Sequence, residues 1–197
     1  MPKRDEAHME GQRERIMRAA LFCIAEKGVE RTSVSDIWKK AGLSAGALYV
    51  HFKNKDELIA ATIARFSASD DIPQPRSWDE FKALVLTPLR LGEDPAYQGI
   101  DPARLRLYLL ADSVRSDTLR AVRKPPFEAE LKIVALMLKA LEASNAIELR
   151  LAATETAEAM AAYVDGMWLQ GLELDRPATK TAKLIDRGLD LFVKGLK

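Results

Sequence analysis

The chain has 197 residues, of which 48% are hydrophobic and 30% charged, as in an ordinary globular protein. Its formal net charge is +1, and residues 1–57 carry 11 Lys and Arg against 9 Asp and Glu, so any surface for nucleic acid must come from local arrangement of charge. The single cysteine, Cys23, excludes an intrachain disulfide and favours a reducing compartment.

The N-terminal sequence predicts short helices joined by tight turns. Apolar residues recur at helical spacing over 11–27, and Gly28 is placed to end that first helix. Ser33 and Asp36 have the spacing of a capping box at the start of a second helix, which Gly42 ends.

Two further helices are predicted directly after this turn. Ser44 caps a third helix that reaches about Phe52, and Asn54 caps a fourth. Asp56 and Glu57 lie in the first turn of the fourth helix, where acidic groups complement the helix dipole.

The remainder of the chain continues the helical periodicity, with almost no alternation of apolar and polar residues. Helices are predicted over about 78–91, 102–115, 126–143, 153–174 and 179–195, with a shorter turn near 116–122. The sequence therefore predicts an all-α fold.

The N-terminal sequence lacks the apolar stretch of a signal peptide. No apolar run reaches the roughly 18 residues of a membrane span. A cytoplasmic protein without membrane contact is predicted.

The second and third predicted helices have the arrangement of a helix-turn-helix unit, with Gly42 in the turn. In such units the second helix enters the major groove of DNA with its N-terminal residues foremost. The small residues 44–47 would let this helix approach the base edges closely. Because they offer little hydrogen bonding, base reading must depend on Ser35, Ser44, thymine-methyl contacts and DNA shape.

The segment "TSVSDIWKKAGLSAGALYVHFKNKDELIAA" resembles the DNA-binding region of the TetR family of bacterial transcriptional regulators. The resemblance covers about 11–62 and keeps "AGLS", "LYVHF" and "NKDEL" in the family order. It implies phosphate or base contacts by Ser33, Ser35, Ser44, Ala45, Gly46, Ala47, Tyr49, His51 and Lys55. The chain departs from the family pattern at Trp38, where alanine is common, and the sequence does not identify the neighbours of this indole.

The resemblance implies two domains, a three-helix DNA-binding domain over 1–55 and an effector-binding and dimerisation domain over 56–197. The predicted helix 153–174 is apolar on two sides, so one side needs a second surface to cover it. Together with helix 179–195 and the same helices of a second copy, it would form a four-helix bundle in a homodimer. Its segment "AAYVDGMWLQGLEL" resembles the penultimate helix of members similar to the repressor of choline–betaine metabolism.

An effector cavity is likewise implied by the family resemblance. Candidate lining residues are Phe66, Trp78, Phe81, Tyr108, Phe127, Met137, Met160, Tyr163 and Met167. Such a cavity would be mainly apolar, with Tyr108, Tyr163 or Asp112 as polar anchors, and would favour an apolar or aromatic effector. The same residues at the same spacing also fit an ordinary core.

Enzymatic chemistry finds little support in the sequence. His8 and His51 are the only histidines, no cluster has metal-ligand spacing, and no nucleophile lies beside a base, so neither a metal nor a cofactor is predicted. The sequence predicts a ligand-responsive, dimeric transcriptional repressor that binds a palindromic operator in double-stranded DNA. The alternatives are an effector-blind DNA-binding dimer and a small helical enzyme without DNA binding.

Overall fold

The computed structural model describes residues 2–67, 74–86 and 97–196, and it divides the chain into two compact units. Unit 1 comprises residues 1–68 and 89–124, and unit 2 comprises residues 69–88 and 125–197. This division follows packing, whereas the predicted division at residue 55 follows function and stays a prediction.

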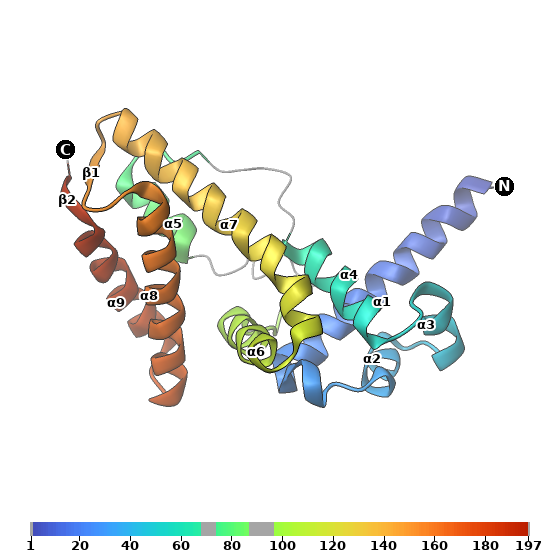
Figure 1. The fold of residues 1–197 in the computed structure, drawn as a ribbon. Coiled ribbons are helices and arrows are strands. Elements are labelled where there is room, and N and C mark those ends of the chain that lie inside the picture. The colour runs from blue at the N-terminus through green and yellow to red at the C-terminus, as the bar shows by residue number, and fades with distance from the viewer. Residues whose placement is uncertain (1, 68–73, 87–96, 197) are drawn as a thin grey trace. The chain divides into compact units, whose positions relative to one another are not determined.

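In its described residues, unit 1 consists of helices and the turns that join them (Figure 1). Its helices are α1 (Pro2–Arg31), α2 (Val34–Ala41), α3 (Ala45–His51), α4 (Lys55–Ser67), α6 (Pro102–Arg115) and the first part of α7 (Asp117–Ala143). Helix α1 packs against α2, α4 and α6 and is the central element of the unit.

Helix α1 begins nine residues before the predicted start at residue 11, because residues 3–10 contain neither glycine nor proline and continue the helix. Gly28 was predicted to end this helix. It breaks the helical geometry with φ 83° and ψ 169°, but the prediction of the end was wrong, because a last helical turn follows to Arg31. A Cβ at Gly28 would lie 3.0 Å from Oδ2 of Asp112, so both the backbone angle and the space require glycine there.

The predicted caps of α2, α3 and α4 are confirmed. Ser33 and Asp36 form a reciprocal capping box at α2, and Gly42 ends this helix in the left-handed conformation with φ 63°. Ala47 N–H donates to Ser44 Oγ at α3, and Glu57 N–H donates to Asn54 Oδ1 at α4.

Two hydrophobic clusters hold unit 1 together. The first joins α1, α2, α3 and α4 through fully buried residues, among them Ile16, Ile37, Leu48, Phe52 and Leu58. The second joins α1 and α4 to α6 and α7 through Ile24, Ile59, Leu105, Leu119 and their neighbours. Trp38, whose neighbours the sequence left open, is half-buried against the first cluster, and Lys39 Nζ lies 5.5 Å from its ring centroid.

Unit 2 contains the second part of α7 and three further helices, α5 (Trp78–Leu86), α8 (Ala153–Glu173) and α9 (Ala178–Leu189). Helix α9 packs against both α5 and α8. The predicted helix 78–91 is confirmed as far as Leu86, and residues 87–91 lie outside the described residues.

The C-terminal part of the all-helical prediction was wrong in one detail. Helix α9 ends at Leu189, and a 3₁₀ turn over Asp190–Phe192 leads into strand β2 (Val193–Leu196), which pairs antiparallel with β1 (Ile147–Leu149). Buried and exposed residues alternate along β1, so its apolar side chains reach the core from an extended backbone. The fold is otherwise helical, as predicted.

The predicted break between a turn near 116–122 and a helix from 126 was also wrong, because α7 runs continuously from Asp117 to Ala143 through Pro125 and Pro126. Two prolines remove two amide donors, which ordinarily bends or ends a helix. Here each half is held by its own core contacts, Leu119 in unit 1 and Leu138 in unit 2.

None of the helices in the described part of the chain is both long and apolar enough to cross a membrane.

Candidate nucleic-acid interface

The position of α3 is fixed from its inner side and from both ends. Leu48 is completely buried and Phe52, which follows the helix, is 1% exposed, so both anchor α3 in the first cluster. Leu43 N–H donates to Trp38 O in the turn that joins α2 to α3. The helix-turn-helix arrangement predicted from the sequence is therefore present.

The outer side of α3 carries small and apolar residues. Ala45 and Gly46 are exposed, and Tyr49 and Val50 are 54% and 67% exposed. A Cβ added to Gly46 would meet nothing nearer than Ser44 Oγ at 3.9 Å, so this side of the helix is open. A large partner could reach the backbone of the first turn without meeting bulky side chains.

The serine hydroxyls near α3 are engaged in capping. Ser44 Oγ accepts from Ala47 N–H at 3.2 Å. Ser33 Oγ donates to Asp36 Oδ2 at 2.6 Å and lies 2.8 Å from Ser35 Oγ. These three serines, with Ala45, Gly46, Ala47 and Tyr49, lie on α2 and α3 or at their starts, and their DNA contacts stay a prediction.

His51 faces α1. Its Nε2 lies 3.2 Å from Gln12 Oε1, and Arg13 donates to the His51 carbonyl oxygen at 3.1 Å. Burial, reinforced by the positive charge of Arg13, lowers the pKa of His51, so the ring is neutral at neutral pH. A neutral imidazole can still donate one hydrogen bond to a phosphate, but it contributes no charge.

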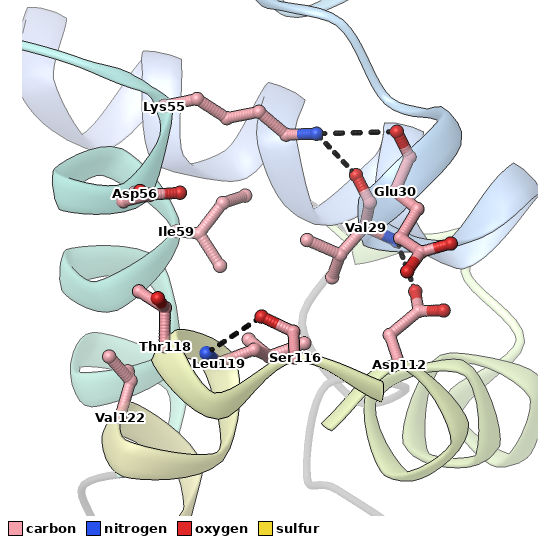
Figure 2. Close-up of a pocket in the computed structure, with 10 residues that line it drawn as sticks. All are labelled: Val29, Glu30, Lys55, Asp56, Ile59, Asp112, Ser116, Thr118, Leu119 and Val122. Atoms are coloured by element: carbon pink, nitrogen blue, oxygen red, sulfur yellow. Dashed lines mark hydrogen bonds between the residues drawn. The ribbon is translucent and has the colours of Figure 1, made fainter. Parts of the chain in front are cut away.

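Lys55 joins the start of α4 to the end of α1. Its Nζ donates to Val29 O at 2.6 Å and to Glu30 O at 3.4 Å, as Figure 2 shows. An ammonium has three donors, so these two acceptors leave a third for a phosphate. The predicted phosphate contact of Lys55 is thus compatible with its bonds and stays a prediction.

A cavity of about 170 Å³ lies beside these bonds, within unit 1 (Figure 2). Its walls come from the end of α1, the start of α4 and the connection between α6 and α7, and they include Ile59, Ser116, Leu119 and Val122. The lining is apolar between α4 and α7 and polar around Lys55.

Asp112 ties α6 to the end of α1 at this cavity. The residue is 5% exposed, and its Oδ2 accepts from Val29 N–H at 2.7 Å. Arg115 donates to Asp112 Oδ1 at 3.1 Å and pairs with Glu30 at 3.2 Å. Asp112, suggested from the sequence as an effector anchor, thus has protein partners for both oxygens.

The predicted effector residues are distributed over both units. Phe66 and Tyr108 lie in unit 1, and Trp78, Phe81, Phe127, Met137, Met160, Tyr163 and Met167 lie in unit 2. Trp78 stacks on Phe81 with ring centroids 5.1 Å apart and donates to Asp190 Oδ1 at 2.8 Å. Met160 is 2% exposed, and Tyr163 donates to Leu184 O at 3.0 Å. Whether an effector contacts any of them stays a prediction.

Sequence reasoning missed Gln12, Arg13 and Val50. Gln12 and Arg13 lie on the part of α1 that contacts His51, and no local pattern announces a contact between residues 38 or 39 positions apart. Val50 could have been found from its position four residues after Gly46, on the side of the helix that Leu48 does not occupy. Among the described residues, no group of metal-ligating side chains lies together.

Comparison with known proteins agrees with this geometry. Residues 16–62 match the family model described as bacterial regulatory proteins, tetR family. The uncharacterized HTH-type transcriptional regulator YvdT of Bacillus subtilis is 44% identical over 61 residues, which span 31% of this chain and 29% of YvdT. The HTH-type transcriptional regulator TtgR of Pseudomonas putida is 29% identical over 208 residues, covering 98% of this chain and 96% of TtgR.

Solved structures are similar over nearly the whole chain. A TetR-family transcriptional regulator from Rhodococcus sp. superposes with a TM-score of 0.74 at 22% identity, covering 93% of this chain and 98% of that one. SmeT, solved as a complex with triclosan, superposes with a TM-score of 0.66 at 23% identity, covering 93% and 92%. At these identities the similarity shows the fold.

The capped α2–turn–α3 segment and its open outer face define a helix-turn-helix protein of the DNA-binding class. Residues 16–62 therefore match the DNA-binding region of the TetR family. The relatives YvdT and TtgR are both named as HTH-type transcriptional regulators, and the solved structures share the fold.

Proposed function

We propose that the chain is a dimeric repressor that binds a palindromic DNA operator in the bacterial cytoplasm and is released by a small apolar or aromatic effector. Each subunit would place α3 in the major groove of one half-site. The two α3 helices of the dimer would then lie one helical turn apart, at about 34–36 Å.

The observation that carries this proposal is the outer side of α3. Leu48 and Phe52 anchor the helix in the core, while Ala45, Gly46 and Tyr49 are turned to solvent. Small residues at the leading turn are what close approach to base edges requires, and the free amide groups there favour a phosphate. Basic residues nearby, Lys39 and Lys53, are exposed and available to the flanking backbone.

Dimerisation is supported by exposed apolar side chains on α8, at its C-cap and on α9. Leu169, Leu174 and Leu184 are 54%, 63% and 37% exposed, although both helices already pack against each other. A second copy would cover these residues, as the predicted four-helix bundle requires. A palindromic operator needs the same two-fold symmetry.

Effector release is supported by the structural neighbour SmeT, which has been solved with triclosan, a small aromatic molecule. In this chain the bonds of Asp112 and Lys55 to the end of α1 provide a physical route from α6 and α4 to the DNA-binding helices. An effector could bind more tightly to a conformation in which α4 or α6 is arranged differently than to the DNA-binding conformation. It would then weaken DNA binding by the difference between its affinities for these two conformations.

One observation favours the effector-blind alternative. Trp78 and Phe81, two of the predicted lining residues, are 4% and 0% exposed and already have each other and Asp190 as partners. A thermal-shift screen of apolar and polar compounds, followed by operator release, distinguishes the two. Stabilisation and release by an apolar compound supports the responsive repressor, and the absence of any response across both classes supports the alternative.

The function itself is tested by selecting bound duplexes from a random pool at near-physiological salt. A repressor of this kind enriches a palindrome with half-sites about one turn apart. Salt-sensitive binding without enrichment would contradict the proposal, because it would show phosphate contacts alone.

A further inference from the structure

Ala45, Gly46, Tyr49 and Val50 form a single stripe along α3, hereafter the α3 stripe. Their spacing of one and four residues places them on one side of the helix. All four are exposed, and Val50, at 67%, is the most exposed large side chain of the helix. The fold therefore leaves this stripe uncovered within unit 1.

Val50 has no packing role that explains its identity. The neighbouring Leu48 and Phe52 are almost completely buried and carry the contacts of α3 with the core. A β-branched residue is also a poorer helix former than alanine, so Val50 slightly weakens a helix of seven residues. Single exposed valines are common on protein surfaces. Val50 differs because it is the bulkiest aliphatic group on a stripe otherwise made of Ala45, Gly46 and the Tyr49 ring.

Polar groups that could read bases nearby already have partners. Ser44 Oγ accepts the capping bond, Ser33 and Ser35 bond each other, and His51 Nε2 faces Gln12. Apart from the Tyr49 hydroxyl, the α3 stripe offers only apolar contact and backbone to a partner.

In the major groove, the apolar group that distinguishes one base pair from another is the 5-methyl group of thymine. We infer that Val50 contacts a thymine methyl group in each half-site and so determines part of the operator sequence. This inference rests on the proposed DNA-binding function. Ala45 and Gly46, one turn earlier, allow the approach that brings an isopropyl group to that depth in the groove.

The test uses the full-length protein and a duplex enriched from the random pool. Each thymine is replaced in turn by deoxyuridine, which keeps every hydrogen-bonding group and removes only the methyl group. One replacement in each half-site should weaken wild-type binding about fourfold per half-site, the value expected for burying one methyl group. Affinities are compared at one fixed salt concentration.

The variant Val50→Ala assigns the contact. It should bind the thymine duplex more weakly than wild type does, and it should lose the discrimination between thymine and deoxyuridine at the sensitive position. The matched control is Val114→Ala, since Val114 is 70% exposed on α6 of the same unit and should leave the discrimination unchanged. Unchanged thermal unfolding of both variants would show that the fold is retained.

Equal wild-type affinity for all thymine and deoxyuridine duplexes would overturn the methyl contact while leaving the DNA-binding function intact. Full discrimination retained by Val50→Ala would overturn the assignment to Val50. Failure to enrich any duplex would instead contradict the DNA-binding function, and the inference with it.

Discussion

The α2–α3 segment and the α8–α9 pair are both two helices joined by a short connection, but different forces position them. Ser33 and Ser44 cap α2 and α3 with their own side chains. The N-cap residues of α8 and α9 are Ala152 and Pro177, whose side chains accept no capping bond. At α8 only the Glu155 side chain contributes, accepting from Ala152 N–H at 3.3 Å. Local bonds therefore define the first segment, and tertiary contacts define the second.

The close contacts of α8 with α9 depend on glycine. A Cβ at Gly171 would lie 2.6 Å from Thr181 Oγ1, and one at Gly188 would overlap the Tyr163 hydroxyl. In α3, by contrast, a Cβ at Gly46 would approach only Ser44 Oγ, at 3.9 Å, without crowding. Glycine in unit 2 thus serves packing, whereas Gly46 serves no contact within the chain and is free to serve an external one.

The largest effect is expected from Gly188→Ala. The added methyl group displaces the Tyr163 ring from Leu184 O and from its edge contact with Phe192, which should destabilise the protein by roughly 2–3 kcal/mol in urea unfolding. The control Gly166→Ala, with nothing within 4 Å of the new Cβ, should be neutral or stabilising. Equal effects of both variants would contradict the packing role of Gly188.

A smaller loss is expected from Lys82→Met. The Lys82 side chain is 9% exposed and pairs with Asp186 at 3.4 Å and Asp190 at 3.2 Å, joining α5 to α9. Burial acts to lower the pKa of Lys82, but hydrogen bonds and charges from Asp190 and Asp186 outweigh it and raise the pKa. The ammonium is therefore charged at neutral pH.

Removing this charge leaves two aspartates one helical turn apart and should cost about 1–2 kcal/mol, because both are partly exposed and screened. Urea unfolding at low and high salt measures the loss, which should shrink as salt rises. The control Lys183→Met, at an exposed position of α9, should change stability by less than about 0.5 kcal/mol. A Lys82 effect as small as this control would contradict the role of the pair.

Lys55→Ala tests whether Lys55 stabilises unit 1, binds DNA, or does both. Loss of the bonds to Val29 O and Glu30 O should lower the free energy of unfolding by about 1 kcal/mol. The logarithm of the DNA-binding constant falls linearly with the logarithm of the salt concentration. Loss of one phosphate contact should make this negative slope shallower by about 1. The control Tyr49→Ala should weaken binding to all DNA sequences without changing that slope. An unchanged slope in Lys55→Ala would contradict the phosphate contact and would show that Lys55 only stabilises the fold.

The smallest effect is expected from Asp36→Asn, measured as stability against pH. Lys27 at 2.7 Å and then Ser33 hold the pKa of Asp36 well below its ordinary value of 3.8. Folding thus favours the ionised carboxylate, so its contribution is present above pH 3.8 and is lost as the pH falls below it. As the pH falls below 3.8, the free energy of unfolding should decrease more steeply for the wild type than for Asp36→Asn.

Lys27→Met is the matched test of cause for Asp36. It removes the first partner of the carboxylate and should flatten the same acid limb, with little further change in the double variant. Parallel acid limbs for wild type and Asp36→Asn would contradict the account of the capping box.

Much of unit 1 could be predicted because its signals are local. Ser33, Gly42 and Ser44 act within four residues along the chain, so caps and turn can be read directly from the sequence. The strand pairing of Ile147 with Leu196 could not, since it joins residues far apart in the chain. The same limit hid the acceptors of Lys55, which lie at the end of a helix that ends more than twenty residues earlier.

Trp38 and α7 illustrate a second limit. Whether an indole at position 38 is covered depends on the helices packed around it, and its half-buried state against the first cluster emerges only in three dimensions. Pro125 and Pro126 favour a helix boundary by local rules, yet core contacts on either side keep α7 continuous. The residues for which the resemblance predicts DNA contacts lie on α2, on α3, beside them or at the start of α4, and these contacts stay a prediction. The exposure of Val50, at 67%, is visible only in the folded structure.

The most direct test of the central claim compares the affinity of the wild-type protein for its enriched duplex with that for a shuffled duplex of the same length and composition, at one near-physiological salt concentration. The account predicts that the enriched duplex binds at least about 10³-fold more tightly, because α3 reads base edges as well as phosphates. Equal affinity for the two duplexes would show phosphate contacts alone and would contradict it.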